Sequence, residues 1–152
     1  MGFPRKGRSE REAMTITTEA LNQRGVGKFP GLVGLVFTRS GGTEIEAEFR
    51  VRTELMAPNG FLHAGSIVTL ADTACGYGCI AHLPLGAENF TTIELKSNFL
   101  ATVRGGTIVC VATPAHLGRA TQVWDALVTD QASGRRIALF RCTQMILWPR
   151  PS

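Results

Sequence analysis

The stretch that decides the fold is residues 61–83, with the sequence FLHAGSIVTLADTACGYGCIAHL. Residues from about 64 to 82 form the only long helix candidate in the chain, and apolar or small side chains cover nearly the whole circumference of that helix. A helix that is apolar all round belongs in a core. Gly76 and Gly78 carry no side chain, so neighbouring groups can approach the helix closely there. We therefore predict a buried central helix.

The segments before this helix predict one short helix and two strands. Thr17-Thr18 is a typical cap for a helix that ends near Gly25, and Phe29-Pro30-Gly31 is expected to break the chain. Leu32–Thr38 is apolar and strand-like and leads into a tight glycine turn. Residues 45–51 then alternate strictly between apolar and charged side chains, which indicates a strand with one buried face.

The chain after the central helix is almost entirely strand-like. Segments rich in Val, Ile, Thr, Phe and Trp are separated by short turns, and neighbours of this kind pair antiparallel. These segments lie at about residues 90–100, 107–116, 121–129 and 136–147. One antiparallel sheet with the hydrophobic helix on its concave face satisfies the pattern, so the predicted fold class is α+β. We expect residues 1–13 to form a flexible N-terminal tail and residues 14–152 to form one domain.

The composition is that of a globular protein. Of the 152 residues, 44% are hydrophobic and 18% are charged, and the formal net charge is +4. No basic run is interleaved with aromatic side chains, so we expect no nucleic-acid partner. The four cysteines lack zinc spacing, so we expect no metal. Without a recognisable signal peptide they are expected to stay reduced, which favours the cytoplasm.

Asp72 is the one charged side chain between Glu54 and Glu88. A membrane span is not expected here, because an Asp near the middle of a span costs about 2.5–3.5 kcal/mol. A buried, unpaired carboxylate is costly or else takes up a proton. Asp72 therefore either bonds a neighbouring strand or faces a dimer interface, or it acts as a general base or nucleophile in a dry cleft.

The start of the same helix offers a second group for chemistry. Backbone N–H groups in the first turn have no partner within the helix and carry the positive end of its dipole. Aimed at a carbonyl oxygen, they form an oxyanion hole, and Gly65 allows a close approach. His63 lies nine residues before Asp72, about half a turn away around a helix. We expect His63 to order the helix entry.

Two motifs together resemble the PaaI-like (phenylacetate-degradation-type) thioesterases of the hotdog superfamily. The first motif is Asn59-Gly60-Phe61-Leu62-His63-Ala64-Gly65, and the second is Leu70-Ala71-Asp72-Thr73-Ala74. The match continues downstream at Thr91–Leu95, Asn98–Leu100 and His116–Arg119, and it covers roughly residues 30–148.

The resemblance implies a hotdog fold, in which a curved antiparallel sheet wraps a long central helix. It implies an acyl-CoA substrate, no separate cofactor, and a homodimer that pairs into a homotetramer with the site between protomers. Asp72 matches the family's catalytic carboxylate, and the Ala64 N–H, with Gly65, matches its oxyanion donor. Thr92, next to Thr91, matches a hydroxyl from the partner chain that helps to place the water.

Further matched positions concern the loop before the helix and the coenzyme. Contacts to coenzyme A phosphates or pantetheine are implied for Thr91, His116, Gly118 and Arg119. Two departures matter. The family's paired glycines after the histidine are Ala64-Gly65 here, and the loop asparagine is Asn59, with Ala57 at the family's usual position.

Two other functions stay open on the residues alone. A hotdog dehydratase of 3-hydroxyacyl thioesters needs a histidine and a carboxylate facing one carbon, and His63 and Asp72 are the available pair. The flanking motif does not suggest that chemistry. A non-catalytic acyl-CoA-binding module is the third possibility, although no DNA-binding motif is attached to the domain.

Overall fold

A single six-stranded antiparallel sheet organises the chain, with strand order β1-β2-β4-β5-β6-β3. The computed structural model describes residues 16–151, so the predicted tail, residues 1–13, lies outside the described residues. In chain order the elements are α1 (Thr18–Gly25), α2 (Phe29–Val33), β1 (Val36–Arg39), β2 (Ile45–Arg50), a 3-10 turn η1 (Thr53–Leu55), α3 (Ala64–Ala81), β3 (Asn89–Phe99), β4 (Thr107–Leu117), β5 (Thr121–Asp130) and β6 (Arg136–Leu147).

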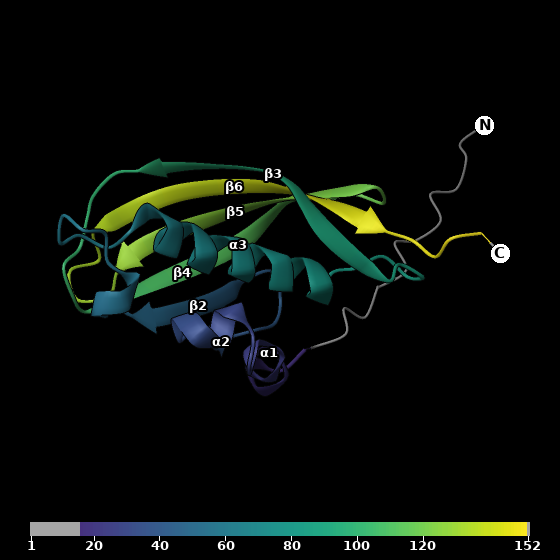
Figure 1. Ribbon diagram of the computed structural model, residues 1–152. Helices are drawn as coiled ribbons and strands as arrows, with labels where there is room; N and C mark the ends of the chain where they lie inside the picture. Colours follow the sequence, from purple (N-terminus) through teal and green to yellow (C-terminus); the bar gives the residue numbers. More distant parts are fainter. Residues whose placement is uncertain (1–15, 152) are drawn as a thin grey trace.

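Figure 1 shows how the sheet curves around α3, while α1 and α2 lie beyond β2 at one side of the sheet. The long helix contacts five of the six strands, β2 to β6. This arrangement confirms the α+β prediction, and the helix and the four strands after it agree closely with the predicted ranges. Among residues 16–151, no helix combines the length and the hydropathy needed to cross a bilayer.

The region around Pro30 differs from the prediction. Phe29-Pro30-Gly31 was expected to break the chain, but it begins α2, and the first strand starts at Val36 instead of Leu32. Proline suits the first turn of a helix, because its missing N–H has no partner there. Gly34, with φ of 80°, then ends the helix in the left-handed conformation.

The first helix, α1, follows its prediction and also protects one edge of the sheet. The Thr17 side chain accepts a hydrogen bond from the Ala20 N–H at 3.2 Å, which is an N-cap. Asn22 then bonds the backbone of Phe37 in the edge strand β1 twice, accepting from its N–H at 2.7 Å and donating to its carbonyl at 3.2 Å. These bonds satisfy backbone groups on β1 that no strand pairs.

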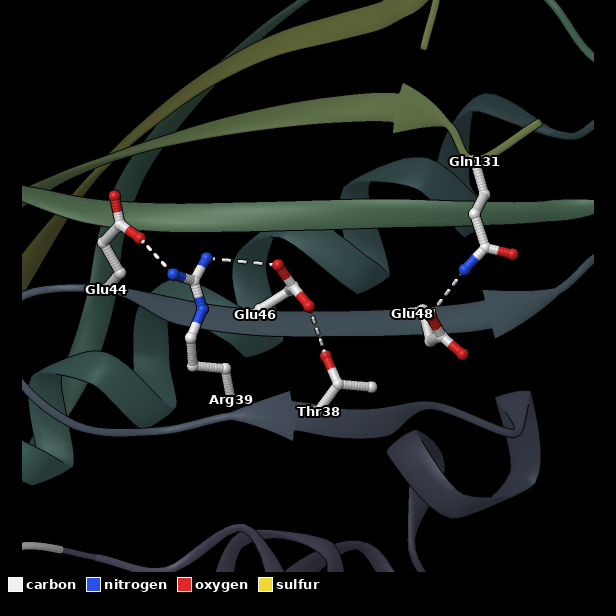
Figure 2. A network of polar contacts seen from close by, with 6 residues as sticks. All are labelled: Thr38, Arg39, Glu44, Glu46, Glu48 and Gln131. Atoms are coloured by element: carbon white, nitrogen blue, oxygen red, sulfur yellow. Dashed lines mark hydrogen bonds and ion pairs between the residues drawn. The ribbon is translucent and has the colours of Figure 1, made fainter. Parts of the chain in front are cut away.

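The alternation predicted for residues 45–51 is confirmed in β2. Its buried side chains are Ile45, Ala47 and Phe49, and its glutamates face outward. Figure 2 shows this outer face, where Arg39 bonds Glu44 at 2.7 Å and Glu46 at 3.1 Å. Such exposed pairs contribute little stability each, so the strand is held mainly by its buried face.

Two glycines let α3 sit deep in the concave face of the sheet. A Cβ atom at Gly76 would lie 2.8 Å from the ring of Phe90, and one at Gly78 would lie 2.6 Å from the ring of Trp124. Both distances are too short for carbon atoms, and Trp124 is itself fully buried. The helix therefore approaches β3 and β5 more closely than any larger residue would allow.

We expect Gly78→Ala to destabilise the protein by about 1–3 kcal/mol, the usual cost of an overpacked core. The indole of Trp124 has to move to admit the new methyl group, and this outweighs the higher helix propensity of alanine. The matched control is Gly105→Ala, where an added Cβ meets nothing within 4 Å. Urea unfolding measures both variants, and equal stabilities would contradict the close seating of α3.

Candidate active site

Asp72 lies half-buried on α3 and points toward the edge strand β3. The Thr92 hydroxyl of β3 is 3.2 Å from Asp72 Oδ1. Burial raises the pKa of Asp72, and the hydrogen bond from Thr92 opposes that rise. None of the ion pairs formed by residues 16–151 includes Asp72. The carboxyl is therefore partly desolvated and not neutralised, as a general base requires.

The contact between Thr92 and Asp72 joins two predicted site residues within one chain. It follows from the sheet order, since β3 is the edge strand beside β6 and contacts α3 of the same chain. The placing of the water by a Thr92 hydroxyl from the partner chain stays a prediction.

Gln144 completes a chain of polar groups behind Asp72. It pairs directly with Thr92 across β6 and β3, and its Oε1 lies 2.8 Å from the Thr92 hydroxyl. Its side chain is fully buried. Gln144 is absent from the predicted site residues, although one signal was available. It is a polar residue in a row of alternating inward positions whose neighbours, Cys142 and Ile146, are buried.

His63 caps the N-terminus of α3, as the sequence predicted. Its Nδ1 accepts a hydrogen bond from the Gly65 N–H at 2.8 Å. The Gly65 amide is therefore already committed to His63. The Ala64 N–H has no acceptor among residues 16–151, so it is the amide in this turn that stays available to a ligand.

The loop before α3 is held by its own hydrogen bonds. Asn59 Oδ1 accepts from the Phe61 N–H at 3.2 Å, and Ala57 bonds the carbonyl of Phe61 at 2.7 Å. The Leu62 N–H donates to the Val103 carbonyl at 2.9 Å, which fixes the loop to the segment before β4. Asn59 thus bonds within the loop turn in this chain, and these hydrogen bonds fix the loop that leads into Ala64.

Asp72 and Ala64 stand apart within one chain. They are eight residues apart on the same helix, which corresponds to about 12 Å along the axis at 1.5 Å per residue. A thioester carbonyl cannot contact an amide at one of these positions and a water held by the other. The two groups can act on one carbonyl only if they come from different copies of the chain.

Three of the four residues expected to hold coenzyme A gather at one turn. His116, Gly118 and Arg119 lie at the β4–β5 turn, and the guanidinium of Arg119 stacks over the Trp148 ring at 4.0 Å. A Cβ at Gly118 would lie 2.5 Å from His116 Nε2, so glycine leaves room for the imidazole. Thr91 is exposed on β3 next to Thr92. These side chains form no bond to Asp72.

A cavity of about 440 Å³ lies near the start of α3 and contains none of the predicted site residues. Within it, Arg104 stacks over the Phe61 ring at 4.3 Å, and Arg135 donates to the Thr102 carbonyl at 2.5 Å. The two arginines come from separate turns, so no local sequence pattern joins them. No group of three His, Cys, Asp or Glu side chains within the described part of the chain is arranged to hold a metal ion.

Comparison with known proteins gives consistent matches. A sequence profile described as the thioesterase superfamily matches residues 59–137. The 1,4-dihydroxy-2-naphthoyl-CoA hydrolase of Escherichia coli (strain K12) is 33% identical over 135 residues, which cover 87% of this chain and 96% of that protein. The proofreading thioesterase EntH of Cronobacter sakazakii is 33% identical over 134 residues, covering 87% and 95%. A thioesterase from Haemophilus influenzae superposes with a TM-score of 0.83 at 30% identity, covering 89% and 93%.

We expect Asp72→Asn to raise the free energy of unfolding at pH 7. The pKa of Asp72 is raised by burial in the folded state, so the folded chain binds more protons than the unfolded chain above the ordinary carboxyl pKa. Wild-type stability therefore falls as the pH rises from that ordinary value through the raised one. The asparagine variant lacks this loss, so its advantage should disappear in acid. Urea unfolding from pH 3 to pH 8 measures the difference.

Asp125→Asn is the matched control with the opposite sign. The hydrogen bond from Arg141, at 2.6 Å, lowers the pKa of Asp125. Its contribution to stability is present at neutral pH and is lost as the pH falls through the lowered pKa. A loss of stability at pH 7 in Asp72→Asn as well would show that burial does not dominate at Asp72.

Proposed function

This chain belongs to the thioesterase superfamily, and from that membership we propose that it hydrolyses an acyl-CoA at a site shared between two copies of the chain. Thioester hydrolysis is the reaction that the superfamily and its named relatives have in common. The observation that carries the proposal is the half-buried, unpaired carboxyl of Asp72, held by a hydroxyl beside an open sheet edge.

Coenzyme A is the thiol that we propose for the substrate. One relative is named as the hydrolase of an aromatic acyl-CoA, which makes aromatic acyl groups the first to test. The net charge of +4 favours a polyanionic ligand. At the turn that holds His116, Gly118 and Arg119, the exposed guanidinium of Arg119 lies over the flat indole of Trp148. This pair suits a phosphate group and the adenine ring of coenzyme A. No additional cofactor is needed for the reaction.

In the proposed reaction, Asp72 acts as a general base. It takes a proton from water as the water oxygen attacks the thioester carbonyl carbon. The C–S bond then breaks, the acid is released, and the proton returns from Asp72 to the departing thiolate. A carboxyl whose pKa is raised by burial is better matched to this task than an exposed one. Direct attack by Asp72 on the carbonyl is the alternative use of the same carboxylate.

The Ala64 N–H is the proposed oxyanion donor. Negative charge develops on the carbonyl oxygen during attack, and an amide at a helix N-terminus stabilises it through the hydrogen bond and the helix dipole. The amide has no competing acceptor among residues 16–151. Because it lies about 12 Å along α3 from Asp72, we propose that each site pairs Ala64 of one protomer with Asp72 of the other.

The open edge of β3 supports a second copy as the partner. This strand has eleven residues and, among residues 16–151, pairs only with β6. Apolar side chains along it are markedly exposed, with Ile93 at 55%, Leu95 at 42% and Phe99 at 46%. An edge of this kind invites pairing with another strand, and a symmetric pair buries the same patch twice. Leu139 and Met145 of β6 are also exposed and suit further pairing into a tetramer.

The activity is tested with the purified protein and a series of acetyl-, medium-chain, long-chain and aromatic acyl-CoAs, by following free thiol release. We expect release from at least one substrate, and a fall of about a hundredfold or more in Asp72→Ala, the scale of general-base loss. Asp130→Ala, at the end of β5, is the control. Hydration of an enoyl-CoA without thiol release, or binding without turnover, would contradict the proposal.

A second experiment tests the oxyanion donor with Ala64→Pro. Proline at the first helical position is well tolerated and removes only the N–H. His63, at φ of −65° and ψ of 136°, already has a conformation that proline accepts in the preceding residue. We expect the turnover number to fall by about 10²–10³-fold while the melting temperature stays near that of the wild type. Wild-type turnover in this variant would remove Ala64 from the mechanism.

Co-expression tests whether two chains share the site. In a mixed dimer of Ala64→Pro and Asp72→Asn chains, one site combines both defects and the other has neither. Random pairing makes half of the dimers mixed, so activity should recover to about a quarter of the wild-type value. Each variant alone stays inactive. Failure of the mixture to exceed either variant, in dimers shown to be mixed, would place both groups within one chain.

A further inference from the structure

Gln144 is a buried polar side chain that the proposed reaction has not used. It is 0% exposed, and a buried amide is costly unless both of its ends are bonded. Its Oε1 faces the Thr92 hydroxyl at 2.8 Å, and its Nε2 donates to Cys142 Sγ at 3.3 Å. The amide therefore lies between the hydroxyl that contacts Asp72 and a thiol in the core.

The Thr92 hydroxyl has one proton and faces two acceptors. A threonine hydroxyl donates once and accepts through its lone pairs. Gln144 Oε1 is 2.8 Å away and Asp72 Oδ1 is 3.2 Å away, so the shorter contact is with the amide. When the proton points to Gln144, the hydroxyl presents a lone pair to Asp72. That arrangement suits a protonated carboxyl and opposes a carboxylate.

The orientation of the amide decides which way this proton points. With Nε2 toward Cys142, as the structure has it, the Oε1 atom accepts from Thr92. With the amide reversed, Nε2 would donate to Thr92, and the hydroxyl proton would turn to Asp72. The Cys142 thiol in turn neighbours Cys75 of α3, and this neighbour together with burial raises the pKa of Cys75. Both thiols are buried, so the amide end at Cys142 is held inside the core.

We propose that Gln144 is a positioning residue of the hydrolysis: it competes with Asp72 for the Thr92 hydroxyl proton, weakens the hydrogen bond from Thr92 to Asp72, and so makes Asp72 the stronger base. The inference rests on the proposed role of Asp72 as general base. A base that binds its proton more strongly removes a proton from water more readily. The burial that already raises the pKa of Asp72 acts in the same direction.

The other titratable groups near the Asp72 carboxyl do not set its strength as a base. The thiols that face the network are Cys75 on α3 and Cys142 on β6. Glu94 and Lys96 on β3 and Arg141 on β6 are exposed, and none of them bonds Asp72 within residues 16–151. Arg141 is occupied by Asp125 at 2.6 Å. No cation is therefore in place to set the proton affinity of Asp72 in the described part of the chain.

The test is the pH dependence of kcat/KM for Gln144→Met. Methionine is similar in length to glutamine but has no amide oxygen to accept the Thr92 proton. With no amide to accept it, the Thr92 proton turns to the Asp72 carboxylate. The midpoint of the acid limb should therefore move to lower pH, and the plateau should fall by less than on removal of Asp72. An unchanged midpoint would overturn the proposal. Gln144→Glu keeps an acceptor, so its midpoint should stay at the wild-type value or rise.

Two controls separate positioning from a structural role. Gln122→Met removes another amide that is 0% exposed, on the neighbouring strand β5, bonded to Trp124 and to the His82 carbonyl. It should lower stability without moving the midpoint. In a Thr92→Val background, Gln144→Met should no longer move the midpoint, because the hydroxyl that links the two groups is gone. A shift that persists there would overturn the role of Thr92.

Asp72→Asn in the same series keeps the two proposals distinguishable. If this variant is inactive and Gln144→Met leaves the midpoint in place, only the inference about Gln144 fails. If Asp72→Asn keeps wild-type turnover, the proposed function of Asp72 fails, whatever the Gln144 variants do. Far-UV circular dichroism and melting temperature show that each variant is folded. If Gln144→Met does not fold, an acid limb in Gln144→Glu that lies below the wild-type limb overturns the proposal.

Discussion

The close seating of α3 in the concave face of the sheet is the constraint on which the rest depends. Gly76 lies against Phe90 and Gly78 against Trp124, at distances that leave no room for a side chain. Because the helix lies so deep, Asp72 comes within 3.2 Å of a hydroxyl on β3 and is partly removed from water. A helix held further out would leave this carboxyl hydrated, and its pKa would be that of an ordinary aspartate. The packing of two glycines against two aromatic rings thus sets the electrostatics of a site several residues away.

The sequence predicted those features whose signals are local. A long apolar run with one charge marked α3 and Asp72, and strict alternation marked β2. Pro30 was misread, since proline serves equally as a chain break and as a first-turn residue, and only the packing of α2 decides between them. Gln144 was missed because its partner Thr92 is 52 residues away, and strand register is not written in either segment alone. The commitment of the Gly65 amide to His63 depends on one ring orientation, which no sequence pattern specifies.

The proposed site divides its work between two places on one helix. The base is in the middle of α3, where burial is high, and the free amide is at its start, where the helix dipole and the lack of partners favour an anion. One position on the helix cannot be both in its buried middle and in its first turn. The proposed second copy, related by a twofold axis, would resolve the conflict by bringing the start of one helix to the middle of the other. The acyl-group preference would then depend on side chains contributed by both copies.

The two edges of the sheet differ in a way that matters for a newly made chain. The β1 edge is short, and Asn22 occupies the backbone groups of Phe37. The β3 edge is long and carries exposed apolar side chains, which is the pattern that recruits foreign strands and seeds aggregates. If the chain pairs as proposed, a folded chain that has not yet met a second copy is at its most vulnerable, and slow assembly at low concentration would lengthen that exposure. The yield of intact protein in a cell would then depend on synthesis rate as well as on the stability of the fold.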